Sequence, residues 1–185
     1  LWVNVYGVSE RYLNVYGEKD LRAQMNQFFH RTYTHPVDGT TLDMKMLCNW
    51  YWYDETAILE TGKGTKDWNF YRYAETLLSA AEAIAQSSGV NAEAAGYLAQ
   101  VKARANMEGK DVSTIASELQ RLGKQAFIEE CWKERLREFP LEMKIWDDCV
   151  RTGKFPQISA TNKGEVQFVD LIGATTVSYT HLRAH

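Results

Sequence analysis

Arginine and glutamate side chains recur in two stretches of the chain, at spacings that place them on helices. Their members are Arg72, Glu75, Glu82, Glu134, Arg135, Glu138 and Arg151. The remaining faces of these helices are apolar, so a charged side chain is tolerated there only beside an opposite charge, with its hydrogen bonds filled. We therefore predict that the stretches near residues 72 and 135 meet inside one helical body as a structural ion-pair network.

Adjacent carboxylates occur at Glu129-Glu130 and at Asp147-Asp148. Glycoside hydrolysis uses two carboxylates that flank one sugar bond. Neighbouring residues on a helix point about 100° apart, so they do not face each other across such a bond. We predict no catalytic residue, and the chain is not expected to be an enzyme.

Metal and cofactor sites are not expected either. The histidines, none at ligand spacing from another, are His30, His35, His181 and His185. The 3 cysteines form no Cys-x-x-Cys pair. Cys131 and Cys149 lie in apolar helical patterns, which favours buried thiols.

Aromatic residues are numerous, with 6 Trp, 10 Tyr and 7 Phe, and a surplus of this kind often faces a ligand or a partner. The candidate ligand-binding residues are Trp50, Trp52, Tyr53 and Trp68. The apolar face of a pyranose packs on such rings, while ring NH and OH groups bond its hydroxyls. The alternative, that these rings cover the helical core, stays open. Trp132 and Trp146 lie in helical stripes and are predicted to be core.

Charge and hydropathy exclude several classes of function. A formal charge of -3 gives no basic stripe for nucleic acid. No apolar run approaches the roughly 20 residues that a membrane-spanning helix needs. The chain begins Leu1-Trp2 without a signal peptide, so we interpret it as a fragment of one domain.

The elements that must position these residues follow from periodicity. Residues 1–65 lack sustained helical periodicity and form an irregular, loop-rich segment. Within it, a short helix is expected over 20–29 and an extended or irregular run over 44–53. If that run is a strand, Trp50 and Trp52 lie on one side of it. A helix is predicted over 69–86, with Phe70 in its apolar stripe. Asn91 is a plausible N-cap for a second helix, which would form a hairpin with the first.

The rest of the chain is predicted in the same way. A helical stretch over 113–139 should break near Gly123, because its apolar face changes direction there. A shorter amphipathic segment over 141–150 and a strand over 166–172 follow. Residues 66–175 form the helical region, and residues 176–185 match no pattern and are interpreted as a non-native tail.

Three motifs occur together and in a fixed order. The first motif is Arg72-Tyr73-Ala74-Glu75, continued by Leu77-Leu78 and Ala81-Glu82-Ala83. The second motif consists of Leu98, Val101, Arg104 and Ala105. The third motif consists of Glu134, Arg135, Glu138, Phe139 and Glu142, followed by Trp146, Asp148 and Arg151-Thr152-Gly153. With these motifs, the chain resembles the C-terminal half of the SusD/RagB family of outer-membrane glycan-binding lipoproteins. The family often has Gly and Arg where this chain has Met143 and Ile145, and Leu where it has Cys149.

The resemblance implies a mainly α fold, a tetratricopeptide-like helical superhelix with long irregular loops. It implies a non-catalytic cell-surface protein that captures an oligosaccharide or a starch-like polysaccharide for a TonB-dependent, SusC-like transporter. It would lie at the outer membrane, held only through a lipid anchor outside this chain. The alternatives are a helical-repeat scaffold that binds protein and, third, a glycosidase-associated helical domain.

Overall fold

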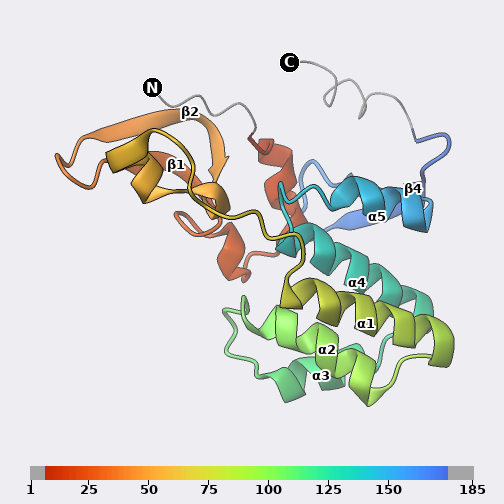
Figure 1. Cartoon of the computed structure of the whole chain (residues 1–185). Coiled ribbons are helices and arrows are strands. Elements are labelled where there is room, and N and C mark those ends of the chain that lie inside the picture. The colour runs from red at the N-terminus through yellow and green to blue at the C-terminus, as the bar shows by residue number, and fades with distance from the viewer. Residues whose placement is uncertain (1–6, 175–185) are drawn as a thin grey trace.

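The structure is a computed structural model that describes residues 7–174, with the backbone only for Lys45. Four helices form its body: α1 (Tyr73–Ser88), α2 (Ala92–Ala103), α3 (Val112–Leu119) and α4 (Lys124–Glu138). Helix α1 contacts both α2 and α4, and α2 contacts α3 (Figure 1). The expected tail at 176–185 lies outside the described residues.

The helix boundaries follow from local signals. The Asn91 side chain accepts a hydrogen bond from the Ala94 amide at 2.9 Å, which confirms the predicted N-cap of α2. Asp111 caps α3 in the same way through Thr114. The predicted break is also confirmed, since Gly123 is extended and stands directly before α4.

The core of the body is made largely of small side chains on α1 and α2. Buried alanines on these helices are Ala74, Ala81, Ala85, Ala94, Ala95 and Ala99. Small contact residues let helices approach closely, and Leu78, Leu98 and Phe127 fill the remaining space. Cys131 and Cys149 are buried free thiols, as predicted.

Removal of the Asn91 cap tests this account of the helix boundary. We expect Asn91→Ala to lower the free energy of unfolding by about 1 kcal/mol, because the Ala94 amide loses its acceptor. Urea unfolding measures the change. Gln100→Ala, at an exposed position of the same helix, is the matched control and should stay within about 0.5 kcal/mol of the parent. Equal changes in both variants would contradict the capping role.

The first helix begins later than predicted. Arg72 is extended (φ -125°, ψ 152°) and occupies the N-cap position, so Phe70 lies before α1 and is 70% exposed. The prediction that Phe70 belongs to the apolar stripe was wrong. The reason is tertiary, since the Arg72 guanidinium is bound by Glu138 and Glu142, and Asn69 donates to the Tyr51 hydroxyl.

The N-terminal part contains a hairpin of β1 (Phe29–Thr34) and β2 (Thr41–Asn49), antiparallel with a bulge between His30 and Thr32. Before it lie the 3-10 helices η1 (Glu10–Val15) and η2 (Leu21–Ala23). The helix expected over 20–29 is therefore only a single turn. The Leu21 amide instead donates to the Ala105 carbonyl oxygen at 2.8 Å, which ties the segment to the end of α2.

The aromatic run does not lie on a strand. Strand β2 ends at Asn49, and the 3-10 helix η3 (Trp50–Trp52) follows. The Asn49 side chain accepts from the Tyr51 amide and donates to the Pro140 carbonyl oxygen, both at 2.8 Å, so it starts the turn and anchors it to the helical body. A π-helical turn, η4 (Ala57–Thr61), and an irregular segment lead to α1.

The C-terminal part consists of α5 (Ile145–Thr152) and a hairpin of β3 (Lys154–Ile158) with β4 (Val166–Asp170). The sequence had indicated β4 but not β3. Pro156 pairs with Phe168 in this two-stranded sheet, where each strand is an edge that tolerates proline. A second core cluster joins Val15, Phe29, Leu136 and Val166, so α4 contributes to both cores.

No helix within residues 7–174 combines the length and the apolar character needed to cross a bilayer.

Candidate functional site

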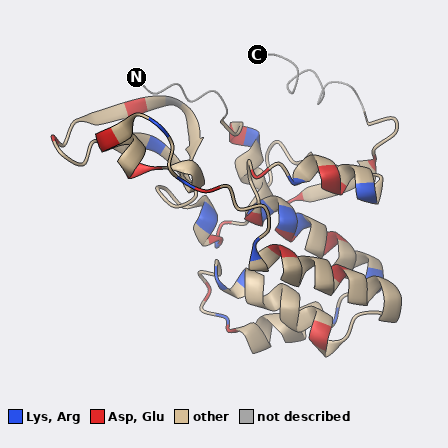
Figure 2. Ribbon diagram, in the orientation of Figure 1, with Lys and Arg blue, Asp and Glu red and all other residues tan. Residues whose placement is uncertain are grey.

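The ion pairs centre on α4, where charged segments of the ribbon lie side by side (Figure 2). Glu138 is fully buried and contacts three guanidinium groups, those of Arg22 and Arg72 at 3.0 Å each and that of Arg104. Arg72 also binds Glu142 through two hydrogen bonds of 2.8 and 2.9 Å. A buried carboxylate is thus surrounded by the cations that its burial requires.

A second group of pairs connects α1, α4 and α5. Arg135 lies 3.3 Å from Glu75 and 2.7 Å from Asp148. Arg151 forms a two-bond pair with Glu82, at 2.7 Å for each bond. The structure therefore brings together the charged residues near position 72 and those near position 135.

A third group surrounds Glu134 and Glu130. Glu134 forms ion pairs with Arg22 at 2.9 Å and with Arg137 at 3.3 Å. The Glu134 oxygen that faces Arg22, Oε1, accepts no well-aligned hydrogen bond. Burial by itself would raise the pKa of Glu130, but Lys102 and Arg137 outweigh it and lower the pKa to about 2. The pKa values of Glu134 and Glu82 are lowered in the same way, against burial, by neighbouring guanidinium groups.

These carboxylates are therefore ionised at neutral pH, and their oxygens are occupied by cations. A general acid needs a raised pKa and access to the reacting group. The arrangement is suited to fixing helices relative to one another. The network also includes charged residues that were not among the predicted network residues: Arg22, Lys102, Arg104, Glu130, Arg137, Glu142 and Asp148.

The predicted ligand-binding residues fall into two ring clusters. Trp50 is stacked with His30 (centroids 3.8 Å apart, 9° between planes) and with Tyr53 (4.5 Å, 10°). Two parallel rings at such distances fit only on opposite faces of the indole. Both faces of Trp50 are thus covered, and within this cluster only the outer faces of His30 and Tyr53 are left for a ligand.

The second cluster joins Trp52 and Trp68, whose ring centroids are 4.7 Å apart with 33° between the planes. Trp68 is 52% exposed, so the Trp52 indole covers part of it and the rest faces solvent. Tyr51 meets Trp52 edge to face at 4.8 Å. Trp68 is therefore the ring of this set that is best placed to receive a ligand.

Further exposed aromatic side chains follow Trp68 along the chain. Phe70, Tyr71 and Tyr73 are 70%, 71% and 71% exposed. Lys144 holds this segment, since its ammonium group donates to the Phe70 carbonyl oxygen at 2.7 Å and lies 4.8 Å from the centre of the Tyr71 ring. Sequence reasoning missed these residues because it placed Phe70 in a helix, although the aromatic run itself was a visible signal.

Two comparisons with known proteins identify the chain. The family model of the SusD family matches residues 11–178. The chain belongs to the SusD family.

A crystal structure of a SusD superfamily protein from Parabacteroides distasonis ATCC 8503 is similar, with a TM-score of 0.73 and 26% sequence identity. The match covers 90% of this chain and 34% of that protein, so the chain spans about a third of its length. The predicted mainly helical, tetratricopeptide-like fold is confirmed. No curated protein matches the chain.

The turn that follows α4 differs from the SusD-family pattern at one position. Met143 stands where the family often has glycine, and its backbone is left-handed, with φ 60°. Glycine adopts this conformation without the steric penalty that a Cβ atom brings. The Met143 side chain is 75% exposed, so this position gains no packing in return.

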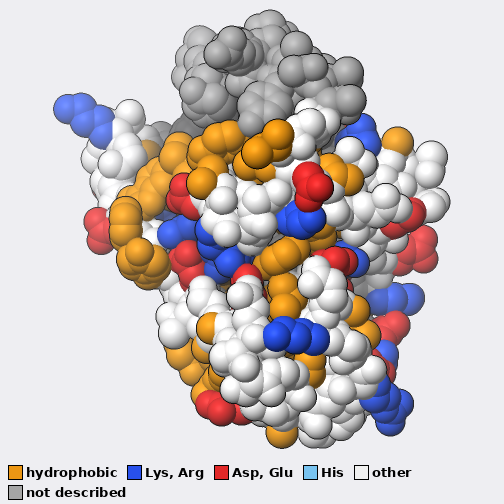
Figure 3. Space-filling model, turned by 90° about the vertical axis from the view of Figure 1, so that its right-hand side faces the viewer, with side chains coloured by type: hydrophobic (Ala, Val, Ile, Leu, Met, Phe, Trp, Pro, Cys, Tyr) orange, Lys and Arg blue, Asp and Glu red, His pale blue; other side chains and the backbone are white. Residues whose placement is uncertain are grey.

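The expectation that Trp146 is core was wrong, because it is 52% exposed. Successive residues of a helix point about 100° apart, and α5 turns Ile145 and Cys149 towards the body instead. Hydrophobic side chains are visible on the face of this SusD-family chain that carries α5 (Figure 3). Trp132 is partly buried against the helical core, edge to face with Phe168 at 5.2 Å.

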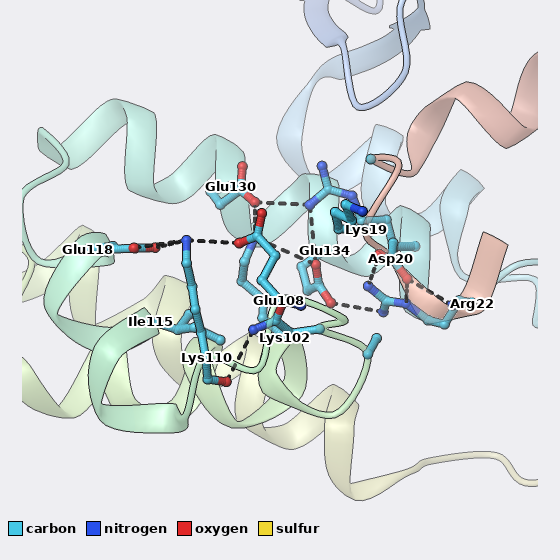
Figure 4. A pocket seen from close by; sticks show the side chains of 14 residues that line it. Lys19, Asp20, Arg22, Lys102, Glu108, Lys110, Ile115, Glu118, Glu130 and Glu134 are labelled. Atoms are coloured by element: carbon cyan, nitrogen blue, oxygen red, sulfur yellow. Dashed lines mark hydrogen bonds and ion pairs between the residues drawn. The ribbon is translucent and has the colours of Figure 1, made fainter. Parts of the chain in front are cut away.

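Two cavities adjoin the ion-pair network. One, of about 270 Å³, is lined by charged side chains that, apart from Lys19, already pair with one another (Figure 4). Lys110, for example, lies 3.0 Å from both Glu108 and Glu118. The other, of about 340 Å³, lies between η2, Tyr51 and the start of α1. Among the described residues, no group of three or more His, Cys, Asp or Glu could hold a metal ion.

Proposed function

We propose that this SusD-family chain is part of a non-catalytic, cell-surface protein that binds glycans. One observation carries the proposal, the half-exposed indole of Trp68 backed by Trp52. An indole that packs on a second ring on one side offers its other face to the apolar side of a pyranose. Trp52 also fixes the orientation of Trp68, which reduces the entropy lost when a ligand binds.

The finer points of the proposal rest on family membership. The protein would capture an oligosaccharide or a starch-like polysaccharide at the outer membrane and pass it to a TonB-dependent, SusC-like transporter. A lipid anchor outside this chain would hold it at the membrane. A transporter gene beside the full-length gene would support this assignment.

Affinity electrophoresis against a panel of polysaccharides tests glycan binding. The 185-residue chain should be retarded by at least one gel, and Trp68→Ala should weaken that binding about tenfold, since stacking on one ring contributes on the order of 1–2 kcal/mol. Trp146→Ala is a matched control because Trp146 is equally exposed, at 52%, and lies on α5. It should leave retardation unchanged.

Two results would contradict the proposal. If no polysaccharide retards the chain, a helical scaffold that binds protein becomes the better interpretation. If the chain releases reducing sugar from a retarding polysaccharide, it is an enzyme.

A further inference from the structure

The cavity of about 340 Å³ is lined by one arginine with unused donors. Arg104 lines it, and the Arg104 side chain is 58% exposed. Its Nη2 donates to Glu138, and within residues 7–174 that carboxylate is the only partner of the guanidinium. Nε and Nη1 of Arg104 therefore remain available to a ligand.

Every guanidinium nitrogen of the other two arginines of the cavity has a carboxylate partner. Arg72 directs its nitrogens to Glu138 and Glu142, and the Arg22 nitrogens bind Asp20, Glu134 and Glu138. Arg22 and Arg72 are therefore fixed parts of the cavity lining, and Arg104 is the arginine that can bind a ligand. The Arg104 Nη2 atom carries a second N–H, which together with the adjacent N–H of Nε or Nη1 can bind a carboxylate through two parallel hydrogen bonds.

The remaining walls suit a sugar ring. Phe28 and Tyr51 supply aromatic surface, and Gln27 is an exposed amide on the same cavity. Apolar ring faces pack on phenyl groups, and amides exchange hydrogen bonds with hydroxyls. Tyr51 also contacts Trp52, so one ring of the cavity wall touches the ring cluster that includes Trp68. The volume is in the range of small-molecule pockets.

We propose that this cavity binds a sugar residue that carries a carboxylate, and hence that the glycan is a uronate-containing polysaccharide. The inference rests on the proposed function and adds the class of glycan. Arg104 binds the carboxylate, Phe28 or Tyr51 receives the ring face, and Gln27 bonds a hydroxyl. The rest of the glycan chain extends over Trp68.

A pair of polysaccharides with one backbone separates recognition of the carboxylate from recognition of the sugar. Affinity electrophoresis is run in gels with polygalacturonate, with its fully methyl-esterified form and with an uncharged glucan. The parent chain should be retarded more strongly by polygalacturonate than by the ester. Arg104→Gln should weaken binding to polygalacturonate about tenfold, because a charge-assisted hydrogen-bond pair is lost.

Further variants keep the test independent of folding. Arg104→Lys retains the charge beside Glu138 but loses the planar fork, and it should also weaken binding several-fold. Gln27→Ala, at an exposed position, should lower the affinity for the acid and for the ester alike. Arg121→Gln is the control, an exposed arginine outside the cavity, and should behave as the parent. Thermal melts verify that each variant is folded.

Each result of the electrophoresis either supports or overturns the inference. Stronger retardation by polygalacturonate that depends on Arg104 supports the inference. Equal retardation by acid and ester, or unchanged binding in Arg104→Gln and Arg104→Lys, overturns it. Retardation by uncharged glucan alone also overturns it and leaves the proposed function standing. If no glycan retards the chain, the proposed function fails first and the inference fails with it.

Discussion

Glu138→Gln should lower the free energy of unfolding by about 3–5 kcal/mol, the range for removing one partner of a buried ion pair. Glu138 is 1% exposed and forms ion pairs with Arg22, Arg72 and Arg104. A neutral amide of the same shape removes the one negative charge that these three guanidinium groups share, and Arg104 loses its carboxylate partner altogether. For a chain of this length the melting temperature should fall by roughly 6–20 °C.

Glu118→Gln is the matched control for this substitution. Glu118 also pairs with a cation, Lys110 at 3.0 Å, but its side chain is 50% exposed. Exposed pairs contribute at most about 1 kcal/mol. Urea unfolding of both variants at neutral pH makes the comparison. If the two substitutions destabilise the chain equally, burial is not what makes the Glu138 cluster important.

Acid should destabilise the chain through Glu130. Its pKa in the folded state, about 2, lies below the ordinary 4.5, so the unfolded state binds a proton more readily. The stabilisation is complete above pH 4.5 and is lost as the pH falls from there through about 2. A difference of this size corresponds to about 3 kcal/mol. Wild type should therefore exceed Glu130→Gln in stability by about 3 kcal/mol at pH 7 and by almost nothing near pH 2.

The neighbouring residue supplies the control for the pH experiment. Glu129 is partly buried and accepts a hydrogen bond from Gln125 at 3.0 Å. Glu129→Gln should change stability at pH 7 by under about 1 kcal/mol. Urea unfolding at several values between pH 7 and pH 2 gives the curves. A gap between wild type and Glu130→Gln that stays constant over this range would rule out the linkage.

The ion-pair network and the candidate ligand surface are physically connected. The Arg72 guanidinium lies over the rings of Tyr51, at 5.8 Å, and Phe139, at 4.8 Å. Tyr51 belongs to the turn that also carries Trp50 and Trp52. The same cation thus contacts the end of α4 and the base of the aromatic clusters. Such support lets rings at the surface keep one orientation.

The sequence by itself determined much of the helical body. The stripe from Ala74 to Ala85, the Asn91 cap and the break at Gly123 depend on residues within one or two turns of each other. Local periodicity and capping therefore predict them without tertiary information. The motifs also predicted that charged residues near positions 72 and 135 would meet, because a charge on an otherwise apolar helix requires a nearby partner.

The tertiary structure alone decided where α1 begins, how Trp50 is covered and that Arg22 joins Glu138. The last pair is separated by 116 residues along the chain. Arg72 remains extended because carboxylates 66 and 70 residues away bind it, which overrides the helical preference of its neighbours. These features depend on contacts between distant segments, whose free energies exceed the small local propensities that a sequence reveals.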